Sequence, residues 1–394
     1  MKMLKIILSL SLILIFSAQS FASTATESIN NFAFNAAKIL EYENGEYFFS
    51  PYSILSAFGM AYAGAEGNTA REIEENLGFT AQIHSQLGEL MQDFEVEKAF
   101  SAANRVWLRN GLKLKDAYKD ILLLNYKSSA QKLDFLNKTE ASRKKINAWV
   151  SEKTNGKILN LLQQLEPDTQ MILTNAVYFN AEWESKFNKK FTSEEDFFSD
   201  GCIVDKVTMM KKHGDFLYAE RDGSKIIKIP YKGGRFSLIV FLPPKTAGYP
   251  GTLEDGAKPI TLDADIFKNL LDSMSEYEVD LWLPKFKIEK SYELKDLFDA
   301  LGIKLAFSDF ADFSGITGDE KLKIDAVIHK TFIDVDEEKT EAAAATAIKM
   351  MKATAIAPVK KPQAEFHADH PFRYFILDNY TWTILFAGRQ TFGL

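Results

Sequence analysis

The segment at residues 337–347 has a composition that no ordinary element of a packed domain shares. It reads EEKTEAAAATA and follows Ala326 to Val335, a stretch rich in β-branched and aromatic residues that is typical of a β-strand. The alanine run itself contains good helix formers with almost no side-chain bulk. Side chains that small can pass between two strands that already exist. We therefore expect this segment to be able to enter a sheet built by other parts of the chain.

The alternation of residues in this segment also suits a strand with one buried face. Successive side chains of a strand point to opposite faces, so residues two apart share a face. The first face would carry Thr340, Ala342, Ala344, Thr346, Ile348 and Met350. The second face would carry Glu341, Lys349 and Met351 among alanines. We expect the first face to be buried and the second to be solvated.

The same segment resembles the hinge and reactive-centre loop of serpins, with ADHPF following it at residues 368–372 after a variable stretch. Further motifs resemble serpin landmarks, and they occur in serpin order. They are FFSPYSI at 48–54, GNTAREI at 67–73, INAWV at 146–150, LTNAVYFNAEW at 173–183, LPKFKI at 283–288 and ADFSGIT at 311–317. Together they cover essentially the whole mature chain, so the resemblance does not depend on one motif.

The resemblance implies an α+β serpin fold with three β-sheets, about eight or nine surrounding helices, and an exposed reactive-centre loop at about 337–361. It also implies a metastable native state, stable by rate rather than by equilibrium. A length of 394 residues alone would suggest two or three domains. We find no Pro/Gly/Ser-rich linker or long charge run, and we expect a single domain over residues 23–394.

The N-terminal residues have the pattern of a secretory signal peptide. Lys2 and Lys5 precede an apolar run from Ile6 to Phe16, and small and polar residues follow up to Ala22. The run is shorter than the roughly 20 residues of a comfortable membrane span. We expect cleavage of residues 1–22 and a secreted or periplasmic protein without membrane attachment; a retained anchor is the alternative.

Composition and motifs argue against several other functions. The net charge of −7 disfavours a nucleic-acid partner. We find no nucleophile elbow, HExxH helix, phosphate-binding loop or paired cysteines, and Cys202 is the only cysteine. His367, Asp369 and His370 lie close in sequence, but residue 370 would point away from the other two in a strand. We therefore expect no metal, no cofactor and no enzymatic activity.

The resemblance also assigns residues to two regions of the main sheet. Ser50, Ser53, Asn175 and His329 match the shutter, beneath the centre of that sheet. Each is a polar residue in an apolar strand or at a helix start, and buried polar groups need hydrogen-bond partners. Trp183 and Glu337 match the breach, the upper end of the sheet where loop insertion begins. The pairing of serine with histidine also invites a hydrolase interpretation, but it lacks a recognisable acid partner.

The hinge and the scissile bond follow from the same alignment with the family pattern. The hinge residues are Glu337, Lys339, Thr340, Glu341, Ala342, Ala343, Ala344 and Ala345. If Glu337 is the seventeenth residue before the cleaved bond, that bond joins Ala353 to Thr354; a shift of one residue would put it between Lys352 and Ala353. Inhibitory serpins usually have glycine at the position of Lys339, so lysine here is expected to slow insertion.

The resulting hypothesis is a secreted, monomeric suicide inhibitor of serine proteases. Ala353 at the cleaved bond favours an elastase-like or subtilisin-like target, whereas Lys352 would favour a trypsin-like one. Cysteine proteases are a less favoured target that also forms an acyl-enzyme. The alternative is a non-inhibitory serpin that acts as a carrier or binding module, with the loop as a mere protease substrate. A secreted hydrolase would need a catalytic constellation that we do not find.

Overall fold

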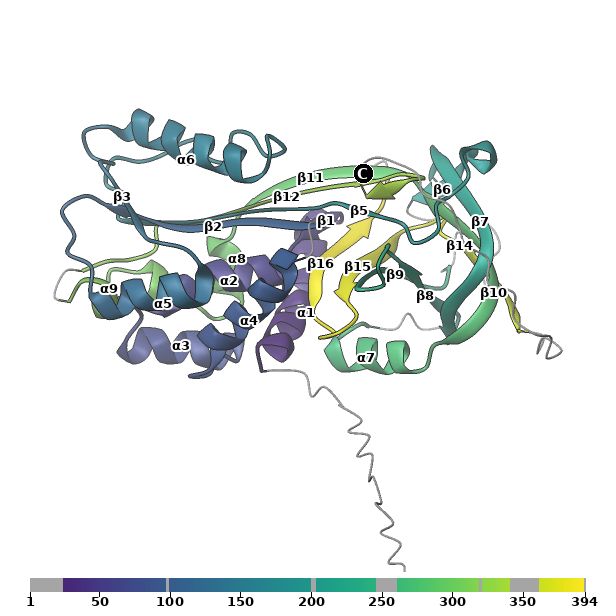
Figure 1. Ribbon diagram of the computed structural model, residues 1–394, viewed down its shortest axis with the longest axis horizontal. Coiled ribbons are helices and arrows are strands. Elements are labelled where there is room, and N and C mark those ends of the chain that lie inside the picture. Colours follow the sequence, from purple (N-terminus) through teal and green to yellow (C-terminus); the bar gives the residue numbers. More distant parts are fainter. Residues whose placement is uncertain are drawn as a thin grey trace, which may run out of the picture.

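The computed structural model describes residues 24–96, 99–199, 203–245, 261–318, 321–340 and 361–392 (Figure 1). The predicted signal peptide at residues 1–22 lies outside these ranges. The described helices are α1 (Thr24–Asn44), α2 (Pro51–Tyr62), α3 (Gly67–Leu77), α4 (Ile83–Val96), α5 (Asp116–Tyr126), α6 (Thr139–Lys153), α7 (Ala264–Asp272), α8 (Lys295–Ala300) and α9 (Ser314–Thr317). Two short 3-10 turns span Lys189–Phe191 and Leu305–Phe307.

A five-stranded sheet separates α6 from the other helices of its half of the molecule (Figure 1). Its strand order is β11 (Phe286–Glu293), β12 (Ala326–Val335), β4 (Met171–Phe179), β2 (Phe100–Arg109) and β3 (Gln131–Leu133). The central neighbours β12 and β4 run parallel and pair directly over seven residues, from Ala326 opposite Ile172 to Phe332 opposite Tyr178. We call this parallel pair the seam, and we call the five-stranded sheet the main sheet.

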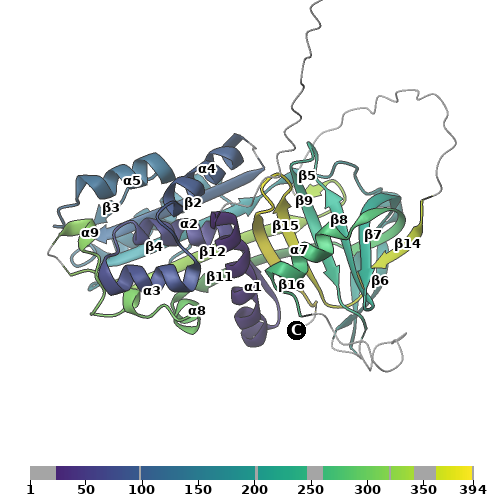
Figure 2. The same ribbon diagram turned by 90° about the horizontal axis from the view of Figure 1, so that it is seen from below.

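A nine-stranded sheet forms the other half of the molecule, as the view from below shows (Figure 2). Its path is β1 (Tyr47–Phe49), β16 (Ile384–Gln390), β15 (Phe372–Asp378), β9 (Phe236–Leu242), β8 (Ser224–Pro230), β7 (Ile203–Arg221), β10 (Ser275–Pro284) and β14 (Gln363–His367), with β6 (Ser193–Ser199) on β7. A third, two-stranded sheet joins β13 (Lys339–Thr340) to β5 (Ala181–Glu182). Three sheets and nine α-helices in the described residues confirm the predicted α+β fold class.

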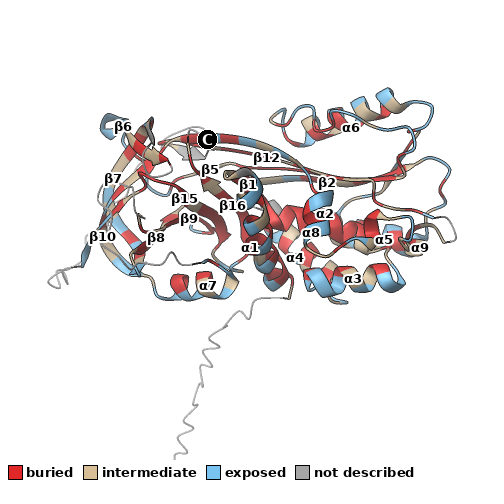
Figure 3. Cartoon of the chain, turned by 180° about the vertical axis from the view of Figure 1, so that it is seen from behind, coloured by how far each residue is buried: buried red, intermediate tan, exposed pale blue. Residues whose placement is uncertain are grey.

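Both faces of the main sheet are covered, which explains why all nine residues of β4 are buried (Figure 3). On one face, Leu173 and Val177 join the large core that α2 and α1 share. On the other face, Ile172 and Ala176 pack under α6, in two small clusters with residues of that helix and of β2. A strand buried on both faces reads as a nearly continuous apolar run, as MILTNAVYF does.

Helix α2 is positioned under the seam by its first residues. Ser50 is the N-cap, and its hydroxyl accepts a hydrogen bond from the Ser53 N–H at 3.2 Å, while Pro51 occupies the first helical position. Eleven of its twelve residues are buried, so the helix is a core element rather than an amphipathic surface helix. The cap therefore fixes two serines at the start of a buried helix.

Gly388 in the centre of β16 provides a test of this core. It pairs with Phe48 and with Tyr374, whose ring lies over it, and a Cβ atom at this position would lie 2.2 Å from Tyr374 Cζ. Substitution Gly388→Ala should therefore lower the free energy of unfolding by about 1 to 3 kcal/mol through overpacking. The matched control is Gly214→Ala in β7, where the new Cβ would meet nothing closer than 3.7 Å. Urea unfolding midpoints measure both, and an equal shift in the two variants would contradict the packing described.

Candidate functional site

The four predicted shutter residues lie together beneath the seam, and each is fully buried. Ser50 N–H donates to His329 Nε2 at 3.0 Å, and the Ser50 hydroxyl donates to the Leu385 carbonyl at 2.6 Å. His329 Nδ1 contacts Asn175 Oδ1, and Asn175 Nδ2 donates to the Ser53 carbonyl at 2.8 Å. The chain of bonds links β12, β4 and the start of α2.

These contacts define the protonation state of His329. Nε2 accepts a hydrogen bond from a backbone N–H, so the proton of the neutral ring is on Nδ1, where it can be donated to Asn175. Burial lowers the pKa of His329 to about 3, since no carboxylate compensates an imidazolium there. The shutter histidine is therefore neutral, and its hydrogen bond crosses the seam between two directly paired residues.

The sequence reasoning did not find three further polar residues: Asn104 joins this network, and Tyr292 and Thr331 bind the backbone of Phe48 beside it. Asn104 lies opposite Asn175 on β2, and its Oδ1 accepts hydrogen bonds from Asn175 Nδ2 and from the Ser53 hydroxyl. The Tyr292 hydroxyl accepts the Phe48 N–H at 3.1 Å, while the Thr331 hydroxyl donates to the Phe48 carbonyl at 2.8 Å. The only sign of Asn104 in the sequence is that it is a polar residue in the β2 segment. Its hydrogen-bond partner depends on the register of β2 against β4, which the sequence does not reveal.

The two predicted breach residues meet at the upper end of the seam. The Trp183 ring is buried and stacks on Tyr231 with centroids 4.6 Å apart, and its Nε1 donates to the Asp336 carbonyl at 2.8 Å. The Phe187 N–H donates to the Glu337 carbonyl at 2.9 Å. The turn that follows β12 is therefore held by the segment that follows β5.

The Glu337 carboxylate adds an ionic anchor to that turn. It is only 5% exposed, and it accepts hydrogen bonds from Lys285 Nζ at 2.8 Å and from the Thr192 hydroxyl at 3.0 Å. Burial raises the pKa of Glu337, but the hydrogen bonds from Lys285 and Thr192 outweigh it, and the pKa lies below its ordinary value. The carboxylate is therefore charged and tied to Lys285, which lies between β10 and β11.

Beyond Glu337, the chain pairs with the continuation of β4. Lys339 lies opposite Glu182 and Thr340 lies opposite Ala181, in antiparallel register. Strand β5 follows β4 after the single residue Asn180, so β13 occupies the position where a new strand beside β4 would start. The other predicted hinge and scissile-bond residues lie outside the described residues: Glu341, Ala342, Ala343, Ala344, Ala345, Lys352, Ala353 and Thr354.

The histidines near the C-terminus do not converge on one point. His370 Nδ1 lies 2.8 Å from Asp369 Oδ1, and Lys245 Nζ lies 2.7 Å from Asp369 Oδ2. His367 instead lies 3.2 Å from the Glu195 carboxylate on β6. Within the described ranges, no group of three His, Cys, Asp or Glu side chains could hold a metal ion.

Comparison with known proteins identifies the family. Residues 27–391 match the family model described as serpin, serine protease inhibitor. A serpin-like protein of Thermococcus kodakarensis is 38% identical over 378 residues, covering 92% of this chain and 84% of that protein. The crystal structure of Serpin48 from Tenebrio molitor has a TM-score of 0.79 and 31% identity, covering 93% of this chain and 97% of that one. Human thyroxine-binding globulin has a TM-score of 0.79 at 27% identity, with 93% and 97% covered.

The chain therefore belongs to the serpin family. Members of this family are in the main protease inhibitors rather than enzymes. Thyroxine-binding globulin, a structural neighbour with the same fold, is a non-inhibitory member whose structure was solved in complex with thyroxine. None of the helices in the described part of the chain is both long and apolar enough to cross a membrane.

The shutter histidine predicts a dependence of stability on pH. The folded protein keeps His329 neutral with a pKa of about 3, whereas the unfolded chain takes up a proton near the ordinary value of 6.5. Its contribution is therefore complete above about pH 6.5 and is lost progressively as the pH falls toward 3. We expect wild type to unfold at a higher temperature than His329→Gln at pH 7.5, and the difference to narrow as the pH falls to 4.

The comparison between these two proteins isolates His329 from other titrating groups. His84, whose pKa burial lowers to about 4, is present in both and contributes equally. A difference in unfolding temperature that stayed constant from pH 7.5 to 4 would contradict the assignment of a neutral, uncompensated imidazole to the shutter.

Proposed function

We propose that this protein is a secreted, single-domain suicide inhibitor of serine proteases. It traps the acyl-enzyme by inserting its cleaved reactive-centre loop into the seam between β12 and β4. The observation that carries this proposal is the β13–β5 pair, because the chain leaving the breach already pairs, in antiparallel register, with the strand that continues β4.

The register of that pair assigns a face to each residue of the entering strand. Each step forward along the loop is one step back along β5 and β4, so Thr346, six positions after Thr340, would pair with Asn175. Directly paired residues in an antiparallel sheet put their side chains on the same face. Thr340, Ala342, Ala344, Thr346, Ile348 and Met350 would then share the core face of Leu173 and Val177. Lys339 and Glu341 would point to the opposite face.

The small side chains of the hinge suit the space that they would enter. In this structure Asn175 lies opposite His329 with no strand between them. The backbone hydrogen bonds and the side-chain contacts of the seam must therefore be re-formed around the inserted strand. On the other face, Val150 of α6 and Ile158 of the segment that follows α6 cluster with Ala176, and Ile328 packs against this cluster. Alanine side chains would displace the core under α2 and the layer of α6 least, which favours insertion.

Chain length is consistent with transport of the protease across the molecule. From Glu337 to Ala353 there are 353 − 337 = 16 steps, and at about 3.3 Å per residue an inserted strand spans roughly 50 Å. The protease serine would attack the carbonyl of Ala353, or of Lys352 in the alternative register, and release the new amino terminus. The acyl-enzyme ester would move with the inserting loop. It would not be hydrolysed, because the protease active site would be distorted.

A carrier function is the second candidate, since thyroxine-binding globulin has the same fold and is found in complex with thyroxine. The two functions differ in the fate of the cleaved loop. A carrier needs no insertion, whereas an inhibitor needs a hinge free of bulky residues, and the run from Ala342 to Ala345 meets that need.

The deciding experiment mixes residues 23–394 separately with pancreatic elastase and trypsin and analyses the products on denaturing gels. We expect a band at the summed mass that resists denaturant, because the acyl bond is trapped. Mass spectrometry of the released C-terminal peptide should show Thr354 first with elastase, or Ala353 first with trypsin. Rapid cleavage within residues 347–361 without that band would favour the carrier function.

Two matched variants test the face assignment in the same assay. Thr340→Arg places a charged side chain on the core face and should abolish the complex while leaving cleavage intact. Lys339→Arg adds the same side chain to the neighbouring residue on the opposite face and should trap protease as wild type does. Equal loss of complex in both variants would contradict the register.

A further inference from the structure

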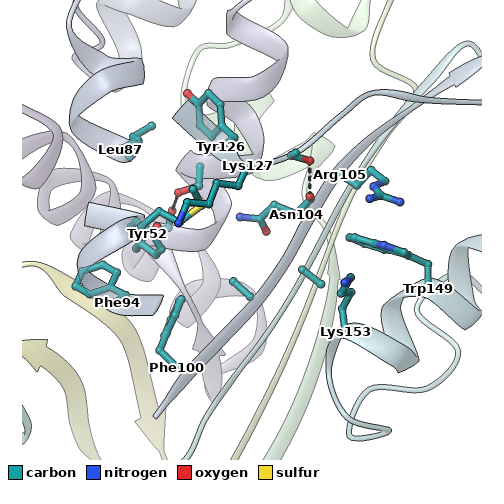
Figure 4. Close-up of a pocket in the computed structure, with 15 residues that line it drawn as sticks. Tyr52, Leu87, Phe94, Phe100, Asn104, Arg105, Tyr126, Lys127, Trp149 and Lys153 are labelled. Atoms are coloured by element: carbon teal, nitrogen blue, oxygen red, sulfur yellow. Dashed lines mark hydrogen bonds between the residues drawn. The ribbon is translucent and has the colours of Figure 1, made fainter. Parts of the chain in front are cut away.

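The polar contacts described above hold the seam at its middle and at its upper end. In the middle, Asn104 of the shutter network points toward α2, whereas the next residue, Arg105, lies over Trp149 of α6 on the other side of β2 (Figure 4). The lower end of the seam, where β4 and β12 begin, is a third level. There a single side chain, that of Asp325, reaches from the start of β12 to β4.

Asp325 binds the first residue of β4 through both its backbone and its side chain. Its N–H donates to the Met171 carbonyl at 2.9 Å. Its carboxylate oxygen Oδ2 accepts the Met171 N–H at 3.1 Å and the Gln170 N–H at 2.6 Å. The side chain is half-buried, and hydrogen bonds to a carboxylate are stronger than those between neutral groups. One residue beside the seam therefore satisfies both backbone groups that Met171 turns toward β12.

An entering strand would make the same set of bonds. Residues of a hydrogen-bonded antiparallel pair exchange two bonds, each N–H donating to the carbonyl of the other residue. In the register proposed above, Met350, four positions after Thr346, would pair with Met171. Its carbonyl and N–H would then replace the carboxylate and N–H of Asp325. In the closed seam, Asp325 therefore occupies the hydrogen-bonding positions of a residue near the end of the inserted strand.

The surroundings of Asp325 allow its carboxylate to leave β4. Asp325 lines a cavity of about 460 Å³ together with the exposed residues Asp168 and Glu293. Burial raises the pKa of Asp325, and the hydrogen bonds from Gln170 and Met171 act in the opposite direction. A carboxylate that turned into this cavity would reach water. Its displacement by an entering strand would therefore not leave an unpaired charge in the core, which would be costly.

A second carboxylate at this end of the sheet binds backbone N–H groups without crossing the seam. Glu293 ends β11, and its Oε1 accepts the Lys295 N–H at 3.1 Å and the Val327 N–H at 3.3 Å. Val327 belongs to β12, so these bonds join β11, α8 and β12 on one side of the seam. Opening of the seam would leave them intact, which makes Glu293 a matched control for Asp325.

We propose that Asp325 is a positioning residue that holds the lower end of the seam closed until the entering strand replaces it. Its part in insertion rests on the inhibitory function proposed above. Because the loop enters at the breach, the bonds of Asp325 to Gln170 and Met171 are the last that the strand must displace. Asp325 therefore controls the rate of the final stage of insertion, in which the protease completes its movement to the lower end of the sheet.

Hydrogen exchange of the intact protein, followed by mass spectrometry, tests the closing role without any protease. Asp325→Ala should speed exchange of the Gln170 and Met171 amides about tenfold or more, because both lose their acceptor. Asp325→Asn keeps an oxygen acceptor without the charge and should have a smaller effect; it decides alone if the alanine variant does not fold. Glu293→Ala should leave both amides at the wild-type rate. Unchanged exchange in the Asp325 variants, or an equal increase in Glu293→Ala, would overturn the assignment.

The rate of insertion is a second readout, which a merely structural role would not change. At saturating inhibitor, protease inactivation reaches a first-order limit that loop insertion sets. This limiting rate constant should be about twofold higher or more in Asp325→Ala, because a barrier is lowered, and unchanged in Glu293→Ala. An unchanged limit in Asp325→Ala would overturn the role in insertion. A wild-type protein that inactivated no protease would instead refute the inhibitory function, and the exchange result would still decide whether Asp325 closes the seam.

Discussion

The direct pairing of β4 with β12 is the constraint on which the rest of this structure depends. Seven residue pairs close the seam, and the Asn175–His329 contact crosses it in the middle of an apolar core. Opening the seam exposes buried donors and acceptors, and a buried polar group without a partner costs about 1 to 3 kcal/mol. An entering strand can offset that cost by bringing its own backbone groups and, in the register proposed, the hydroxyl of Thr346. The same network can therefore keep the sheet closed at rest and admit one particular partner.

The upper end of the seam is held by a different kind of interaction. Lys285 and Thr192 bind the Glu337 carboxylate, and the Trp183 indole binds the carbonyl of Asp336. These contacts fix the turn after β12 while the two strands diverge beyond Phe332 and Tyr178. The polar shutter resists opening, and the anchored turn directs the chain toward β5. This division between the two regions supports the proposal that insertion starts at the breach.

The ordered motifs that resemble serpins predicted the α+β fold class, which the structure confirms, and they also predicted the hinge, most of which lies outside the described residues. An alanine run after an apolar strand is visible without a structure, and Ser50 and His329 stood out as polar residues in apolar surroundings. Asn104 and Thr331 could not be found in this way, because their roles depend on the pairing of β2 with β4 and on the contact of β12 with β1. That pairing joins segments more than 70 residues apart, as Asn104 and Asn175 illustrate.

Thermal unfolding of the intact and the singly cut protein tests the central claim most directly. A single cut within residues 341–360 frees the loop to enter the seam without any protease remaining bound. If the seam is a strained pair that accepts the loop, the cut protein unfolds at a markedly higher temperature than the intact one. An unchanged or lower unfolding temperature after a complete cut would contradict the account, because it would mean that β4 and β12 remain paired with each other.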